Sequence, residues 1–321
     1  MEIAPGIHRV ETPLGDRFVC MYLLVGDDCT LLIDTGIAGM PQDILLPYMA
    51  QANLDPGKLR YVLISHIDFD HTGGNSDVRE LAPDAIMMCH ELDRPMVDDV
   101  EAMITGRYSA YNADHGIDET PETKAEMRQL ARHVSMDIGL RGGEILHLGA
   151  DWRVEILHTP GHSRGHISVH DPRSRTMLIM DAVLWNAVLT KDGAPAFPPT
   201  YRYVDTYLSS IQRIERYDLD LMATTHYPLA QGAGAIAEFC AESYAFVQRT
   251  EAALRNTLQT ANAPMTMKEL IVDLSPKLGK WPDEAGKYLV WPLSGHIERL
   301  QLYGLIETGR RDGLMTMRWA V

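Results

Sequence analysis

Short apolar segments separated by turn residues fill the first 35 positions of the chain. Residues 7–12, 17–24 and 30–33 alternate or run apolar, and residues 13–16 and 26–28 carry the Pro, Gly and Asp typical of turns. Strand-like runs joined by such short turns predict an antiparallel β-meander.

Helical and strand patterns then alternate. Residues 40–53 have the apolar spacing of an amphipathic helix, and Asp-Pro-Gly at residues 55–57 ends it. Residues 61–65 and 85–89 are apolar runs of strand length. A meander followed by alternating helices and strands is typical of an α/β fold.

Residues 91–141 are polar, helical in pattern and interrupted by Pro and Gly. Because this stretch is too long for a plain connection, we expect a helical insertion over the functional site. Four side chains in its centre could contact a substrate or, equally, pack locally on a surface insertion: Arg107, Tyr108, Tyr111 and His115.

The second half of the chain returns to strand patterns. They are, in order, a hairpin at 143–148 and 154–158, strands at 167–170 and 177–180, a Pro-rich loop at 185–200, a helix at 204–216 and a strand at 219–224. Beyond residue 230, helical patterns at 235–260, 266–274 and 289–302 precede a terminal hairpin at 304–308 and 314–319. We therefore expect a domain over residues 1–235 and a smaller one over 236–321.

The densest group of reactive side chains lies in residues 61–75, YVLISHIDFDHTGGN. His66, Asp68, Asp70 and His71 directly follow the predicted strand. Buried carboxylates without partners are costly, whereas imidazoles and carboxylates that converge on cations avoid this cost. Metal binding is therefore the preferred interpretation, and a polar loop that caps the next helix is the alternative.

Several motifs resemble, in their order along the chain, those of the metallo-β-lactamase superfamily. HIDFDHTGG is similar to the H-x-H-x-D-H signature, with Asp68 where the second His usually stands. The other similar pieces are LIDTG at 32–36, HTPGHSRGH at 158–166, MDAV at 180–183 and THYP at 225–228. The resemblance spans roughly the first 235 residues and implies a four-layer αββα sandwich. The tail resembles a winged-helix module appended to some superfamily hydrolases.

Carried over by position, the resemblance implies two divalent ions: one held by His66, Asp68 and His162, the other by Asp70, His71 and His226, with Asp181 bridging both. Zinc is the expected metal. Because Asp68 makes its set harder and more anionic than three imidazoles, manganese and iron are alternatives.

Other polar residues near these motifs are expected to play supporting roles. We expect Asp34 to hydrogen-bond the ligand loop rather than bind metal. His90 is a weaker ligand candidate. His158, His166 and His170 are expected to make structural hydrogen bonds, and His166 is the best candidate of the three for supporting a ligand.

A pair of divalent ions suits hydrolysis, because a water that bridges them loses a proton near neutral pH and one ion polarises the scissile group. Asp70 could orient this hydroxide or relay a proton to the leaving group. We therefore expect a dinuclear hydrolase of a small-molecule ester, lactone, thioester or phosphodiester. A diiron oxygenase or oxidase on the same scaffold is the alternative, since flavodiiron proteins also carry an acidic residue at the position of Asp68.

Composition and charge restrict the class of binding partner that we expect. The 321 residues are 45% hydrophobic and carry a net charge of −15, which disfavours nucleic acid as the main partner. The tail's candidate recognition helix, at residues 288–302, holds only Arg299 and His296 as basic candidates beyond Lys287. Packing or dimerisation is thus the preferred role of the tail, and a homodimer is a candidate assembly.

The four cysteines are scattered without CxxC spacing and are expected to be reduced thiols. We find neither a signal-like N-terminal segment nor an apolar run of membrane-spanning length in the sequence. A cytoplasmic protein that does not enter a membrane is the resulting expectation.

Overall fold

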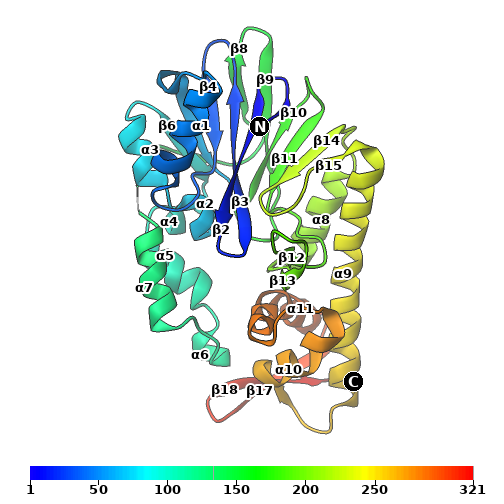
Figure 1. Cartoon of the computed structure of the whole chain (residues 1–321). Coiled ribbons are helices and arrows are strands. Elements are labelled where there is room, and N and C mark those ends of the chain that lie inside the picture. The colour runs from blue at the N-terminus through cyan, green and yellow to red at the C-terminus, as the bar shows by residue number, and fades with distance from the viewer. Residues whose placement is uncertain (133, 321) are drawn as a thin grey trace.

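The computed structural model describes residues 1–132 and 134–320 and contains two large β-sheets that face each other (Figure 1). The strands of the first sheet are, in spatial order, β1 (Glu2–Ala4), β2 (Ile7–Leu14), β3 (Arg17–Val25), β4 (Thr30–Ile33), β5 (Leu59–Ile64), β6 (Ile86–His90) and β7 (Ile138–Leu140). The pairs from β1 to β4 are antiparallel, which confirms the predicted meander, and those from β4 to β7 are parallel.

The second sheet has six strands: β15 (Ala230–Gln231), β14 (Leu221–Thr224), β11 (Thr176–Met180), β10 (Ile167–Asp171), β9 (Trp152–His158) and β8 (Ile145–Gly149). All its pairs are antiparallel except β11 with β14. The loop expected at residues 185–200 contains a small ribbon of β12 (Val188–Leu189) and β13 (Pro195–Phe197).

The two-residue period of the strands separates the layers. In β3, Tyr22 and Leu24 pack between the sheets, whereas Met21 and Leu23 point to the opposite face. That outer face is covered by η1 (Pro41–Leu45), α1 (Leu46–Gln51) and α3 (Asn75–Leu81). The outer face of the second sheet is covered by α8 (Val204–Ile214) and α9 (Gly232–Thr260). The arrangement is the expected four-layer αββα sandwich.

The helical insertion is present but ends earlier than expected. It contains α4 (Arg94–Val97), α5 (Val100–Met103), η3 (Ile104–Tyr108), α6 (Asn112–His115) and α7 (Pro121–Leu130). The expected end at residue 141 is wrong, because residues 138–140 form β7 and pair in parallel with β6. Their three-residue length carries too little periodicity to be recognised as a strand in the sequence.

The tail follows α9 without a break. It consists of β16 (Met265–Thr266), α10 (Met267–Leu278), η4 (Asp283–Leu289), α11 (Val290–Leu302), β17 (Ile306–Arg311) and β18 (Leu314–Trp319). The predicted helices and terminal hairpin are thus confirmed. The likeness to a winged helix and the division at residue 235 stay predictions; α9 crosses that position, and one hydrophobic cluster joins Met177 of β11 to Leu293 of α11.

The basic side chains of the candidate recognition helix are engaged within the molecule. Lys287 pairs with Glu119 at 2.7 Å, and Arg299 pairs with Glu251 at 2.6 Å. His296 is fully buried. These contacts add to the argument against phosphate binding by α11. Among the described residues, no helix is both long and apolar enough to cross a membrane.

Candidate metal centre

All seven predicted ligands meet at one end of the sandwich, where strands from both sheets stop. Three lie in or beside α2 (Phe69–Thr72) and one lies in the loop after β5 (Leu59–Ile64); the other three follow strands of the second sheet. They are His66, Asp68, Asp70, His71, His162, Asp181 and His226. Strand ends separated by up to 160 residues in sequence therefore converge because the two sheets stack.

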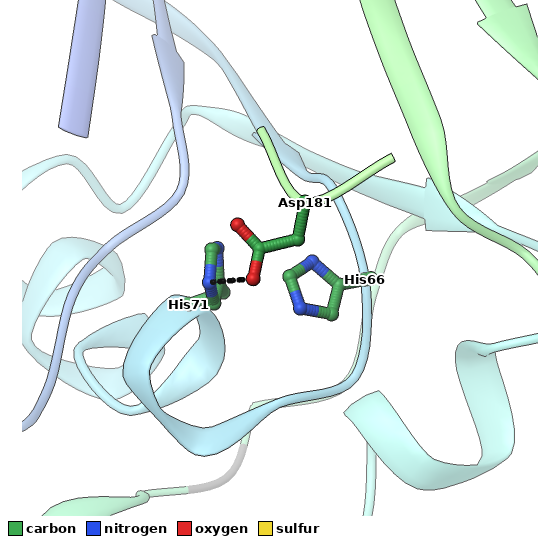
Figure 2. A group of neighbouring side chains, drawn as sticks. All are labelled: His66, His71 and Asp181. Atoms are coloured by element: carbon green, nitrogen blue, oxygen red, sulfur yellow. Dashed lines mark ion pairs between the residues drawn. The ribbon is translucent and has the colours of Figure 1, made fainter. Parts of the chain in front are cut away.

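The seven side chains form two halves that share a centre. His66, Asp68 and His162 make up half-site A, and Asp70, His71 and His226 make up half-site B; each set offers ligand atoms that lie within 4.8 Å of one another. His66, His71 and Asp181 form a third such group that joins the halves (Figure 2). The structure thus brings the predicted residues together in the predicted grouping, and their role as metal ligands stays a proposal.

Hydrogen bonds donated by Nδ1 orient three of the four imidazoles. His71 donates from Nδ1 to Asp34 Oδ2 at 2.7 Å, and His226 donates from Nδ1 to the carbonyl of Phe18 at 2.8 Å. The Ser65 hydroxyl donates to Asp34, so it accepts from His66 Nδ1 at 2.9 Å. In these three rings Nε2 is left to face the centre, where its lone pair can bind a metal when the ring is neutral.

Asp34 supports the centre as expected, without belonging to it. Besides His71, its carboxylate accepts hydrogen bonds from the amide and the hydroxyl of Ser65, both at 2.7 Å. Its backbone has a φ of +59°, and Met180, directly before Asp181, has a φ of +42°. Non-glycine residues rarely adopt this region, and such strained positions cluster at functional sites.

Three buried polar atoms that face the centre have no hydrogen-bond partner among the described residues. They are His66 Nε2, His71 Nε2 and Asp181 Oδ1. Burial alone would lower the pKa of His71, but Asp34, Asp70 and Asp181 outweigh it and raise the pKa to about 10. Burying polar atoms without a hydrogen-bond partner costs free energy. A divalent cation fits, because it would satisfy all three atoms.

Arg107 contacts half-site A directly. Its Nε donates to Asp68 Oδ1 at 2.8 Å and its Nη2 to Asp68 Oδ2 at 2.9 Å, while Nη1 donates to the carbonyl of His162 at 3.1 Å. Burial alone would raise the pKa of Asp68, but Arg107 above all holds it well below its ordinary value. The sequence suggested that Arg107 could contact substrate; it lines the cavity at the centre, and it also pairs with the residue that departs from the family motif.

The remaining histidines lie outside the two halves. His90 stacks on His158 with ring centroids 4.1 Å apart, and His170 pairs with Glu155. Among the described residues, His90 belongs to none of the groups whose ligand atoms lie close enough to hold a metal ion together. His166 stacks on His66 at 5.1 Å and is fully buried, which agrees with its expected supporting role.

A cavity of about 500 Å³ opens onto the centre. Its polar floor includes Asp68, Asp70, Asp181 and His226, and its walls are largely apolar or aromatic. The apolar and aromatic wall residues come from the β2–β3 turn, α2, the insertion, the 185–200 loop and the tail: Leu14, Phe69, Tyr108, Met127, Leu130, Val188, Phe197, Tyr288 and Trp291. Tyr108 thus lies where a substrate contact was suggested, whereas Tyr111 packs edge-on against Trp291 at 5.9 Å.

Two functional contributions were missed in the sequence. Tyr288 and Trp291 bring the tail into the cavity wall, and Asp93 accepts hydrogen bonds from Ser163 and Gly165 beside His162. Asp93 is almost fully buried at 2% exposed. Asp93 is a lone acidic residue in a polar insertion, so the sequence contained no signal of its contacts beside His162. The aromatic residues Tyr288 and Trp291 could have been singled out as candidates for a cavity wall.

Comparison with known proteins agrees with this geometry. The family model described as the metallo-β-lactamase superfamily matches residues 14–226. Human acyl-coenzyme A thioesterase MBLAC2 is 25% identical over 206 residues, which cover 60% of this chain and 66% of that protein, just under two thirds of its length. A hydroxyacylglutathione hydrolase of Arabidopsis thaliana is 26% identical over 122 residues, or 38% of this chain and 33% of that protein.

Solved structures extend the likeness through the tail. A metallo-β-lactamase family protein from Thermus thermophilus, TTHA1429, superposes with a TM-score of 0.74 at 22% identity and covers 98% of this chain and 99% of its own. A β-lactamase domain protein from Burkholderia ambifaria gives 0.75 at 18% identity, with 100% and 94% covered. At these identities the likeness concerns the fold. Since the family model spans most of the chain and contains every predicted ligand, the chain belongs to the metallo-β-lactamase superfamily.

Proposed function

We propose that this protein is a metal-dependent hydrolase of small-molecule thioesters. One observation carries the proposal: the seven ligand candidates converge beneath the cavity, and among the described residues His66 Nε2, His71 Nε2 and Asp181 Oδ1 are buried without a hydrogen-bond partner. Such atoms are expected to be satisfied by a bound cation. Divalent ions at this position would polarise the scissile carbonyl and lower the pKa of a bound water.

The choice of thioesters is supported by the named activities of two relatives. The human relative is named an acyl-coenzyme A thioesterase, and the Arabidopsis relative a hydroxyacylglutathione hydrolase. Both names describe cleavage of an acyl–sulfur bond, although the acid and the thiol differ. We therefore carry over to this chain the type of bond that is cleaved, and we do not carry over either thiol.

The cavity supports an apolar acyl group. Its volume is about 500 Å³, and its walls offer apolar surface from Leu14, Phe197 and Tyr288. Pockets in this size range enclose small molecules, and the few polar groups on the floor fix their orientation. We expect the acyl chain to lie along these walls, with its carbonyl at the polar floor.

The chain's own residues supply the remaining chemistry. Asp70 faces both the cavity and His226, with 3.5 Å between its Oδ2 and Nε2 of the ring, so it can orient the attacking water and transfer a proton to the leaving thiolate. Tyr108 accepts a hydrogen bond from the Phe69 amide, which leaves its own hydroxyl hydrogen for the substrate. Burial and then Asp68 raise its pKa well above the ordinary value, so it stays a neutral donor.

A panel of substrates tests the proposal. Acyl thioesters of coenzyme A and of glutathione, a matched oxygen ester, a lactone and a phosphodiester would be assayed with Zn²⁺, Mn²⁺ or Fe²⁺ and after chelation. We expect thioesters to give the highest kcat/KM, chelation to abolish turnover, and Asp70→Asn to lower kcat by about a thousandfold or more. Equal hydrolysis by chelated protein, or by Asp70→Asn, would refute the proposal.

A diiron redox enzyme is the second candidate. It is favoured by the carboxylate of Asp68 in half-site A and by a short match to a nitric oxide reductase of Moorella thermoacetica, 38% identical over 68 residues, or 21% of this chain and 16% of that protein. Purified protein that contains iron and consumes oxygen during turnover would favour this candidate. Anaerobic hydrolysis with zinc or manganese would favour the thioesterase.

A further inference from the structure

The two halves of the metal centre differ in charge. In half-site A, the single carboxylate, Asp68, is already paired through both oxygens with the Arg107 guanidinium. Half-site B holds Asp70, and Asp34 lies behind its His71 ligand at 2.7 Å. Counting only the ligand carboxylates and Arg107, and leaving out the shared Asp181, half-site A is neutral and half-site B carries one negative charge.

Arg107 also lies close to the ligand atoms themselves. Its Nη2 is 2.9 Å from Asp68 Oδ2 and 3.0 Å from His162 Nε2, and Asp68 Oδ2 in turn faces His66 Nε2 at 3.6 Å. A cation bound by these atoms would therefore lie close to the positive charge of the Arg107 guanidinium. At this separation, and away from bulk water, repulsion between like charges is strong.

Within the described part of the chain, no arginine or lysine pairs with the carboxylate of half-site B. Among the described residues, the basic side chains that pair with Asp70 and Asp181 are imidazoles only, namely His71 and His226. Imidazoles become neutral ligands when they lose a proton, whereas an arginine keeps its charge. The positive charge of Arg107 is therefore a fixed property of half-site A.

The guanidinium is held in place by its surroundings. Arg107 is 5% exposed, its carbon Cζ lies 5.2 Å from the ring centroid of Trp291, and Nη1 donates to the carbonyl of His162. It belongs to η3 of the insertion, which has its own apolar core of Val100, Met103, Ile104, Met127 and Ala131. Arg107 cannot leave half-site A without breaking these contacts.

We infer that the two halves bind metal unequally, with half-site B filled first and half-site A weakened by Arg107. This inference rests on the metal binding in the proposed function and concerns the order and strength of that binding. It also explains why an aspartate stands at position 68. A carboxylate there can accept hydrogen bonds from the guanidinium through both of its oxygens, whereas a histidine could not.

Competition titrations with a chromogenic chelator, using Zn²⁺ and the full-length protein, test the inference. We expect one tight equivalent and a second that is weaker by about tenfold or more. Arg107→Met should strengthen the second step by about 10- to 100-fold, the range found when groups behind metal ligands are changed. Arg107→Lys keeps the charge, so its second step should stay weak.

Three further variants make the assignment specific. Arg94→Met removes an arginine of the same insertion that pairs with Asp98 rather than with a ligand, and it should leave both steps unchanged. His226→Ala should abolish the tight step, whereas His162→Ala should abolish only the weak one. Absorption of bound Co²⁺ would show which equivalent each variant loses.

The outcomes separate the inference from the proposed function. Two equal steps in the unaltered protein, or an Arg107→Met protein with an unchanged second step, would overturn the inference and leave the proposed function intact. If Arg107→Met does not fold, the unaltered protein and Arg107→Lys still test the inference. Stronger binding of the second Zn²⁺ by Arg107→Lys would also contradict it. A folded protein that binds no Zn²⁺ would overturn both.

Discussion

At the scale of single residues, the centre depends on which nitrogen of each histidine is free. Asp34, Ser65 and the carbonyl of Phe18 hold Nδ1 of three rings, and they thereby direct Nε2 to one point. A ring that can turn or change its tautomer is a poorer ligand. The groups behind the proposed ligands would thus contribute to metal affinity without touching the metal.

Asp34→Asn tests this dependence. The amide keeps the size of the side chain but removes the charge that faces His71 at 2.7 Å. We expect Zn²⁺ affinity to fall by about 10- to 100-fold while the fold is retained. Chelator competition measures the affinity, and far-ultraviolet circular dichroism checks the fold. An unchanged affinity would show that Asp34 does not support the ring.

Tyr108→Phe tests the proposed hydrogen bond to the substrate. Removal of one hydroxyl should lower kcat by about 100-fold, as for other donors to developing negative charge, while KM changes little. Tyr111→Phe is the matched control, because that ring packs against Trp291 outside the cavity wall. Steady-state kinetics on one thioester decide. A Tyr108→Phe protein as active as the Tyr111→Phe protein would contradict the role.

The convergence of the proposed metal ligands could be predicted from sequence because these residues stand in short motifs with fixed spacing. Arg107 could be assigned only to the neighbourhood of the site. It is 39 positions from Asp68, and the path of the insertion between them is set by tertiary packing rather than by periodicity. The unusual Asp68 was recognised as a departure, but its partner requires the fold.

At the scale of elements, the tail takes part in the site. Tyr288, at the end of η4, packs against Phe197 of β13 with ring centroids 5.5 Å apart, and both line the cavity. The helices of the tail were visible in the sequence as periodic patterns. Their docking against the cavity was not, because periodicity identifies a buried face without showing what it packs against.

Tyr288→Ala tests whether this wall selects the acyl chain. Loss of the ring should lower kcat/KM for long-chain thioesters by about tenfold and leave short-chain substrates within about twofold. Tyr303→Ala, at a tail tyrosine that is 62% exposed, is the matched control. An equal loss for all chain lengths would show that Tyr288 acts on stability rather than on selection.

A carboxylate joins the long helix α9 to α11. Glu251 contacts His296 at 3.4 Å and Arg299 at 2.6 Å; the hydrogen bond with His296 first, and the charge of Arg299 after it, lower the pKa of Glu251. A lowered folded pKa stabilises the protein above the unfolded pKa of about 4.3, and this stability is lost as the pH falls through the folded value.

Glu251→Gln should therefore destabilise the protein near pH 7 by about 1–2 kcal/mol, with a difference from the unaltered protein that shrinks below about pH 4. Urea unfolding at several pH values measures the free energy. Glu242→Gln is the comparison, at a carboxylate of α9 that pairs with Arg249 on the same helix and accepts one hydrogen bond from Asn186, and it should cost less. A difference that does not vary with pH would contradict the assignment.

At the scale of the whole molecule, the sandwich follows from alternation along its strands. Tyr22 and Met21 face opposite layers, so a chain with this pattern needs a partner sheet on one side and helices on the other. Most strands of the meander and of the second sheet could be located in this way. β7 and β15 could not, because at three and two residues they are too short to show a period.

Anomalous diffraction from crystals grown with Zn²⁺ is the measurement that tests the central claim most directly. The account predicts anomalous peaks at the meeting point of both sheets, the strongest at about 2.0–2.1 Å from the Nε2 atoms of His71 and His226. A well-ordered crystal in which the seven side chains lie apart, with no peak among them, would contradict the account.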